Sequence, residues 1–174
     1  MSSTTYVGMW TGNSKPDNSG DVFFQPWTVV PGSTTSLWAS NVLTFNDSTA
    51  LVYYHGAFKV PAKYEASTAN AILVDWTSTV TTGNRIWFGN YRAIGGDNAE
   101  LYDSTSAQQS TSVTDAAPST ATARLLATIV VSSANFAAGD TVLYRVGVNG
   151  NDASDTLGAR CHVFGMHFRC QVST

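Results

Sequence analysis

Apolar and polar side chains alternate along much of this chain, and the pattern is clearest in its last third. Within residues 141–148 one face of the predicted strand carries Val142, Tyr144, Val146 and Val148. Within residues 162–168 one face carries Phe164, Met166 and Phe168. A period of two residues is typical of a half-buried β-strand. Since a turn rich in Asn, Gly and Asp separates the two runs, we expect them to form an antiparallel hairpin.

Eight such runs follow one another along the chain. They occupy about residues 21–30, 36–45, 50–60, 69–78, 84–94, 122–132, 141–148 and 159–170. Evenly spaced strands without helices predict an all-β protein, a single antiparallel β-sandwich of about eight strands and of the jelly-roll type. The fifth run is apolar on both faces, which indicates a central strand. Trp76 and Trp87 lie inside these patterns, so we expect both in the core.

Two stretches do not follow the strand pattern. Residues 1–20 are rich in turn-forming residues from Gly12 onward, and we interpret them as an N-terminal arm on a jelly-roll domain of residues 21–174. Residues 95–121 are mostly Ser, Thr, Ala, Gln and Asp and are predicted as a long loop. A loop of this length is usually functional or part of an interface, and it could also contain a short edge strand.

The composition supports the all-β prediction and limits the range of partners. Charged residues make up 12% of the 174 residues, about half the usual share, and Lys and Glu are scarce. The net charge is −3 and the nine Lys and Arg residues are scattered, so we expect no nucleic-acid partner. No apolar run has the length of a bilayer span and the first residues do not resemble a signal peptide, so we expect no membrane partner and synthesis in a cytoplasm.

Residues that could support catalysis or bind a metal do not form a recognisable motif. The chain has no nucleophile elbow, phosphate loop or dinucleotide-binding glycine motif. The sequence positions of His162 and His167 differ by an odd number, which predicts that the two side chains lie on opposite faces of one strand. This placement disfavours a zinc site formed by both histidines. The same spacing argument separates Cys161 and Cys170, which we interpret as free thiols. We therefore expect no catalytic residue, no cofactor and no enzymatic activity.

The remaining acidic segments have two interpretations. Asp and Asn residues gather at 97–103 and at 149–155. Clustered oxygen atoms on a loop can bind calcium. Asp and Asn also form turns by bonding their own backbone, and we favour this structural interpretation.

Aromatic residues provide the candidate contact sites. Tyr6, Met9 and Trp10 form a small apolar patch near the start, which either packs on the domain itself or contacts a neighbouring subunit or another protein. Trp27 and Trp38 flank a Pro-Gly turn and are candidates for an exposed aromatic surface on which a sugar could stack.

Several short segments, in this order, carry a resemblance to a known family. They are 43–47 (LTFND), 58–61 (FKVP), 72–78 (ILVDWTS), 86–88 (IWF), 138–140 (AGD) and 155–157 (DTL). Over about residues 40–170 the chain resembles the small jelly-roll virion structural proteins of tailed bacteriophages. These include capsid decoration (cement) proteins and the head modules of tail or fibre proteins.

The resemblance implies a role at the virion surface and no catalytic residues. Because the chain shows one domain and no fibre shaft, we expect a homotrimeric decoration protein that stabilises the head by bridging neighbouring capsomers. Its partners would be further copies of itself and the major capsid protein or another virion protein. The alternative is a host-receptor or carbohydrate-binding head module of a tail or fibre.

Overall fold

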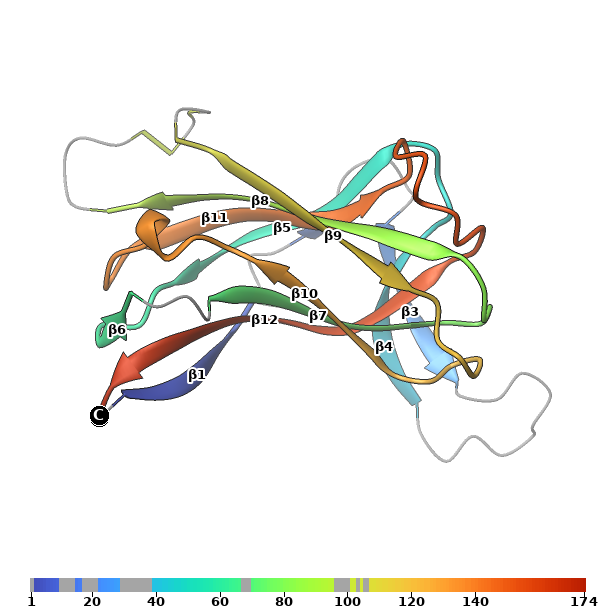
Figure 1. The fold of residues 1–174 in the computed structure, drawn as a ribbon, viewed down its shortest axis with the longest axis horizontal. Helices are drawn as coiled ribbons and strands as arrows, with labels where there is room; N and C mark the ends of the chain where they lie inside the picture. Colours follow the sequence, from blue (N-terminus) through green and yellow to red (C-terminus); the bar gives the residue numbers. More distant parts are fainter. Residues whose placement is uncertain are drawn as a thin grey trace.

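The computed structural model describes residues 2–9, 15–16, 22–28, 39–66, 70–95, 101–102, 104 and 107–174. For residues 15–16, 22–28 and 39–41 it describes the backbone alone. Its strands form two antiparallel sheets that face each other, which makes the protein a jelly-roll type β-sandwich (Figure 1). The predicted fold class is therefore confirmed.

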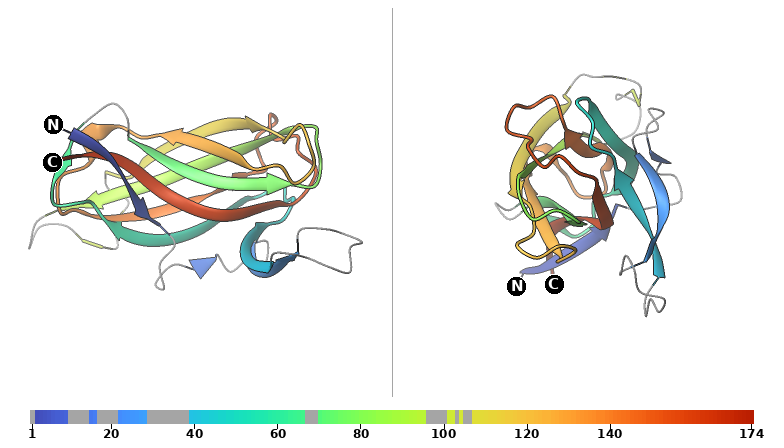
Figure 2. Two further views of the ribbon diagram at one scale, coloured as in Figure 1. Left: turned by 90° about the horizontal axis from the view of Figure 1, so that it is seen from below. Right: turned by 90° about the vertical axis from the view of Figure 1, so that its right-hand side faces the viewer.

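The first sheet has seven strands, and the long strand β12 lies at its centre (Figure 2). The main path runs in the order β10 (Leu125–Val130), β7 (Ala71–Ser78), β12 (Cys161–Ser173), β4 (Ala39–Phe45) and β3 (Val22–Thr28). Two further strands pair with β12, namely β1 (Ser2–Gly8) and β6 (Tyr64–Glu65). Ser2 pairs with Ser173, so the two ends of the chain lie side by side.

The second sheet has five strands and forms the other layer. Its order is β2 (Lys15–Pro16), β5 (Leu51–Lys59), β11 (Thr141–Asn149), β8 (Asn84–Ile94) and β9 (Gln109–Ala116). A 3-10 turn, η1 (Ser133–Asn135), precedes β11. The predicted central position of the fifth run is confirmed, because β8 lies between β11 and β9.

The inward faces of both sheets form one core, as the alternation predicts. The four expected residues of β11 are buried, and Val146 and Val148 are fully so. Trp76 and Trp87 are fully buried and meet edge to face with ring centroids 5.5 Å apart. Full burial of a Val, Leu, Ile, Phe or Met side chain contributes about 1.5–3 kcal/mol relative to exposure. The core between the two sheets therefore contributes most of the stability of the fold.

The connection between β11 and β12 differs from the expected hairpin. The two strands lie in different sheets and do not pair with each other, so that prediction is wrong. Residues 150–160 cross from one sheet to the other, whereas hairpin loops have two to about five residues. Consecutive strands such as β4 and β5, or β7 and β8, also change sheets, which is what closes a sandwich.

A β-bulge at Phe164 overturns the predictions made from odd spacing along β12. The register with β7 shifts between Val163 and Gly165, so one extra residue is inserted there. Phe164 is consequently 40% exposed, not on the inward face with Met166 and Phe168 as expected. Because of the inserted residue, two residues on opposite sides of the bulge lie on the same face of β12 when their sequence numbers differ by an odd number.

The cysteine and histidine pairs show the effect. Cys161 and Cys170 both lie fully buried in the core, and both are free thiols. His162 and His167 pair with Thr77 and Leu73 of β7, which are four residues apart and share the outer face. The expectation of opposite faces is therefore wrong for both pairs.

The N-terminal segment contains a strand that the sequence pattern did not predict, and the long loop contains the edge strand that was one of its two interpretations. Residues 2–8 form β1, which pairs along its whole length with β12 and belongs to the sandwich, in contrast to the expected arm over residues 1–20. Met9 is fully buried, and its carbonyl accepts a hydrogen bond from the Tyr144 hydroxyl. Within the expected loop at 95–121, residues 109–116 form the edge strand β9.

Candidate functional site

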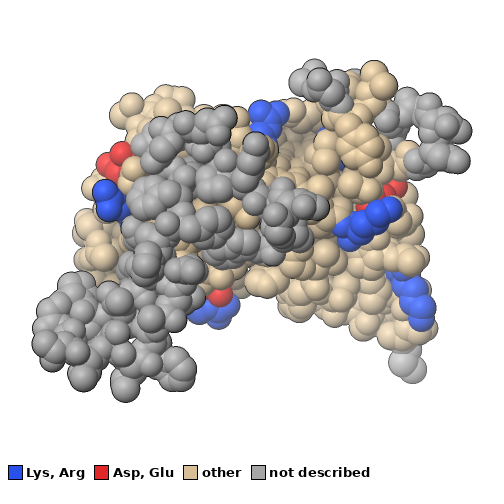
Figure 3. All heavy atoms as spheres, turned by 180° about the vertical axis from the view of Figure 1, so that it is seen from behind, with Lys and Arg blue, Asp and Glu red and all other residues tan. Residues whose placement is uncertain are grey.

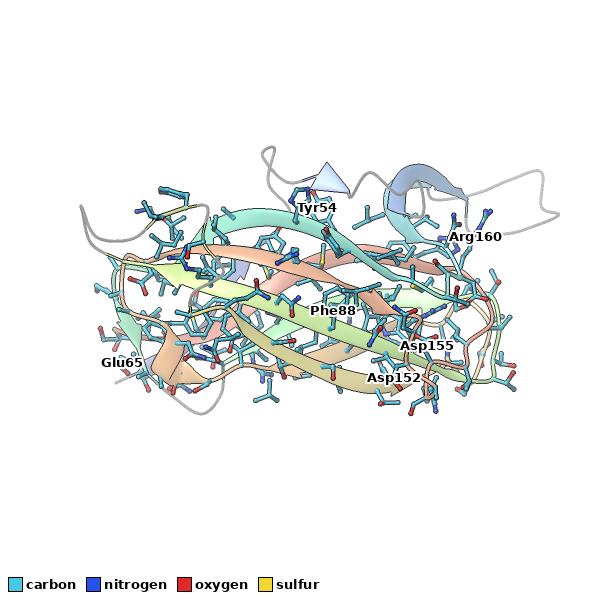
Figure 4. All side chains as sticks on the ribbon, turned by 90° about the horizontal axis from the view of Figure 1, so that it is seen from above. Tyr54, Glu65, Phe88, Asp152, Asp155 and Arg160 are labelled. Carbon is cyan, nitrogen blue, oxygen red and sulfur yellow. The ribbon has the colours of Figure 1, made fainter. Side chains whose placement is uncertain are left out.

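The register of the five-stranded sheet, which faces the viewer in Figure 4, places two rows of side chains on its outer face. One row is polar and consists of His55, Arg145, Asn90 and Ser110 from β5, β11, β8 and β9. The next row contains two aromatic residues and consists of Tyr53, Gly147, Phe88 and Ser112 on the same strands. Because strand register places these residues opposite one another, an aromatic row and a polar row lie side by side.

Gly147 allows the two aromatic rings to meet. The rings of Tyr53 and Phe88 lie with centroids 6.4 Å apart at 82°, an edge-to-face pair. Gly147 separates them in the sheet and adds no side chain, while a Cβ atom at this position would collide with the Val52 carbonyl oxygen. Phe88, which is labelled in Figure 4, is 5% exposed and packs against the partly exposed Tyr53 ring.

Arg145 places its charge beside this aromatic pair. Its guanidinium carbon lies 5.5 Å from the centroid of the Tyr53 ring, within range of a cation–π interaction. Nη2 donates to the Gln108 side-chain oxygen over 2.9 Å. A guanidinium carries five N–H donors, so after this bond Arg145 retains donors that a ligand can use.

The side-chain amide of Asn90 lies between Arg145 and Ser110 in the polar row and can both donate and accept hydrogen bonds. The residue is partly exposed, and its Oδ1 atom is buried without a hydrogen-bond partner in the part of the chain that the structure describes. Rotation of the amide exchanges its donor and acceptor ends. The polar row therefore offers a cation, an imidazole, an amide and a hydroxyl.

A buried ion pair stabilises the end of the sandwich where residues 150–160 cross between the sheets, so these charged residues have a structural role. Arg85 donates to the Asp155 carboxylate over 2.9 Å, and Asp155 also accepts a bond from the Ile86 backbone N–H over 3.0 Å. Asp152 accepts a bond from the Ser154 N–H, as in an Asx turn. These contacts fit the turn-forming interpretation of the acidic segment 149–155.

Several classes of site are absent from the described residues. Three or more His, Cys, Asp or Glu side chains never come together there in a way that could bind a metal ion. On the face drawn in Figure 3, the described Lys and Arg side chains stand apart from one another and form no continuous basic surface. Within the described part of the chain, no helix has the length and apolar character needed to cross a membrane.

Of the five residues predicted from the sequence, the structure describes the side chains of Tyr6 and Met9, and these two lie on different sides of their sheet. Tyr6 is 59% exposed on the outer face of the seven-stranded sheet, whereas Met9 is fully buried and is unavailable as a partner contact in this structure. Trp10 and Trp38, and the side chain of Trp27, lie outside the described residues. Sequence reasoning missed Tyr53 and Arg145, although both occupy outward positions of recognised strands.

Comparison with known proteins finds structural neighbours of low sequence identity. No protein-family model and no curated protein sequence matches this chain. Among solved structures, the arabinose-bound α-L-arabinofuranosidase MgGH51 has a TM-score of 0.49 and 11% identity over 94% of this chain, which spans about a quarter (25%) of that enzyme. The CBM22-1 xylan-binding domain from Paenibacillus barcinonensis Xyn10C has a TM-score of 0.46 and 7% identity, with 94% of this chain and 88% of that domain covered.

A family 30 carbohydrate-binding module of the cellulosomal cellulase Cel9D-Cel44B of Clostridium thermocellum is similar to the same degree. Its TM-score is 0.45 at 7% identity, with 94% of this chain and 96% of that module covered. At such identities the function of this chain has to be argued from its own surface.

Proposed function

We propose that this protein is a non-catalytic glycan-binding module and that the outer face of its five-stranded sheet is the binding surface. The observation that carries the proposal is the position of Tyr53, whose ring contacts both the Arg145 guanidinium and the Phe88 ring. A sugar ring has an apolar C–H face, which packs on an aromatic ring, and a rim of hydroxyl groups, which need hydrogen bonds. The two adjacent rows supply both kinds of contact.

The polar side chains of the two rows match the needs of sugar hydroxyl groups. A hydroxyl both donates and accepts hydrogen bonds. Arg145 supplies donors, Asn90 supplies either function, and the exposed Ser110 and Ser112 hydroxyls supply both at the β9 edge. Because these groups lie on rigid strands, little conformational entropy is lost when a ligand binds.

Affinity electrophoresis in gels that contain soluble polysaccharides tests this proposal. We would use xylan, mixed-linkage β-glucan, mannan and galactan, and we expect at least one to retard the protein. Tyr53→Ala and Arg145→Gln should each remove most of the retardation, because each deletes one half of the surface. Tyr6→Ala and Arg124→Gln are the matched controls, since Tyr6 is exposed on the opposite sheet and Arg124, 70% exposed, directly precedes β10 of that sheet.

The proposal fails if no polysaccharide in a broad panel retards the protein. It also fails if the Tyr6→Ala control loses as much binding as Tyr53→Ala. Circular dichroism and the melting temperature of each variant would separate lost binding from lost folding.

A homotrimeric capsid decoration protein at the virion surface is our second candidate, and a different surface favours it. The outer face of the seven-stranded sheet carries exposed apolar side chains, namely Tyr6 (59%), Leu126 (45%), Val130 (61%) and Phe164 (40%). Exposed apolar groups gathered on one sheet are typical of an interaction surface. This candidate predicts a trimer, so light scattering should give a molar mass of three times 18.5 kDa. It also predicts that the protein binds empty capsids, and it loses its support if no such binding is found.

A further inference from the structure

Residues at the end of the sandwich that carries η1 line a hollow. Figure 1 shows this end of the fold, where η1 leads into β11. Its volume is about 590 Å³, within the range of small-ligand sites. The walls come from the end of β8, the start of β9 and the segment between η1 and β11, and consist of Ala93, Gly95, Ala107, Gln109, Ala134, Asn135, Phe136, Ala137 and Asp140. The hollow is distinct from the outer sheet face, because Ala93 and Gln109 occupy inward positions of their strands.

The floor of the hollow is aromatic and firmly held. The Phe136 ring stacks on Tyr91 with centroids 5.2 Å apart and an angle of 18° between the planes. The Tyr91 hydroxyl accepts a bond from Asn135 Nδ2 over 3.1 Å, and this bond holds the Asn135 amide in place. Phe136 is 8% exposed and also packs against Phe168 with ring centroids 5.0 Å apart. Five of the nine lining residues are Ala or Gly, so the walls around it carry little side-chain bulk.

Three lining side chains retain hydrogen-bond acceptors. Asp140 uses Oδ2 to accept the Ala137 N–H over 2.7 Å, which fixes the carboxylate and leaves Oδ1 with no bond among the described residues. Asn135 and Gln109 use their side-chain nitrogen atoms, in bonds to Tyr91 and to the Ala107 carbonyl. Their amide oxygens are likewise unused within the described part of the chain.

The set of acceptors restricts the chemistry of a ligand. A carboxylate and two amide oxygens need a ligand with several donors, and the aromatic floor needs one with an apolar face. Calcium affinity depends on the number of charged oxygen ligands, and Asp140 is the one acidic side chain among the nine lining residues. A neutral sugar ring has vicinal hydroxyl groups that donate to carboxylate and amide oxygens and a C–H face that packs on an aromatic ring.

We propose that this hollow is a second binding site, which takes a single neutral sugar residue or the end of a sugar chain. Phe136 forms its floor, and Asp140, Asn135 and Gln109 accept bonds from the sugar hydroxyls. The site shares its ligand class with the function proposed above but uses none of the same residues. An experiment can therefore refute sugar binding at one site and leave the proposal for the other site intact.

Saturation-transfer NMR with methyl glycosides of glucose, galactose, mannose and xylose tests the second site. We expect at least one probe to receive saturation, and we expect Asp140→Asn to weaken its binding at least tenfold because a charged acceptor is lost. Ala134→Phe should abolish binding by filling the hollow from an exposed position. Ala138→Phe is the matched control, since Ala138 is exposed in the next turn and does not line the hollow.

The outer-face variant Tyr53→Ala separates the two sites. Binding of the methyl glycoside should survive Tyr53→Ala and disappear in Ala134→Phe. The proposal is overturned if none of the four probes receives saturation. It is equally overturned if Ala134→Phe and Asp140→Asn, both shown to be folded by their NMR spectra, bind as the unmodified protein does.

Discussion

Arg85 and Asp155 form an ion pair in which neither side chain reaches the solvent. The Arg85 Nη1 atom lies 2.9 Å from Asp155 Oδ1, and the two side chains are 0% and 3% exposed. Burial raises the pKa of the Asp155 carboxyl, although the Ile86 N–H and the Arg85 charge lower it. The pair joins the start of β8 to the segment that crosses between the sheets, so it fastens one end of the sandwich.

We predict that Arg85→Leu lowers the free energy of unfolding by about 3–5 kcal/mol, because it leaves the Asp155 carboxylate buried without its counter-charge. Urea denaturation measures the change. Arg124→Leu is the control, since that arginine pairs with Asp75 while 70% exposed, and its loss should cost less than about 1 kcal/mol. Equal costs for the two substitutions would contradict a structural role for the buried pair.

We predict that acidification destabilises the fold through His162. Burial and the nearby Arg160 charge lower the pKa of His162 from 6.5 to about 4. The unfolded chain therefore binds the proton more readily, and stability falls as the pH drops from about 6.5 towards 4, by roughly 3 kcal/mol at the lower limit. The slope of unfolding free energy against pH should flatten in His162→Gln and persist in the control His167→Gln, which changes an exposed histidine of the same strand.

Both thiols should be unreactive in the folded protein. Burial raises the pKa of Cys161 to about 12 and also raises the pKa of Cys170, so neither thiol forms much thiolate at pH 8. An aromatic disulfide reagent should label neither cysteine within minutes under native conditions and both in guanidinium chloride. Rapid native labelling of either residue would show that its strand opens far more often than its buried position indicates.

Gly147→Ala should destabilise the protein strongly. An added Cβ atom would collide with the backbone of β5, which cannot move without breaking its ladder with β11. We expect a loss of about 2–4 kcal/mol, as for other overpacked positions. Gly8→Ala is the control, because an added Cβ atom there has no neighbour within 4 Å. A similar melting temperature for both variants would contradict this role of Gly147.

The strands were predictable from the sequence because each has its own inward face. All eight predicted runs correspond to strands, and Val142, Trp76 and Trp87 are buried as their alternation indicates. Strand β9 shows no such alternation, because its Ser and Thr residues occupy both its inward and its outward positions. It is also an edge strand of its sheet, so it has less need of an apolar face. The bulge at Phe164 was also hidden, because the register of β12 is decided by β7, ninety residues earlier in the chain.

The candidate site was less predictable because it depends on pairing between distant strands. Tyr53, Phe88 and Gly147 come from three strands, and register alone brings them into one row. A glycine inside an apolar strand pattern is the signal that was available, since it often marks a close approach. The choice of which two strands flank it requires the sheet order, which the sequence pattern does not contain.

The most direct test of glycan binding at Tyr53 and Arg145 is an NMR titration that follows backbone amide shifts. An oligosaccharide of the polysaccharide that retards the protein most would be added to the labelled chain. We predict that the largest shifts map to residues 53–55, 88–90, 110–112 and 145–147, which form the two rows on the five-stranded sheet. Shifts confined to the outer face of the seven-stranded sheet, or no shifts at millimolar oligosaccharide, would contradict the account.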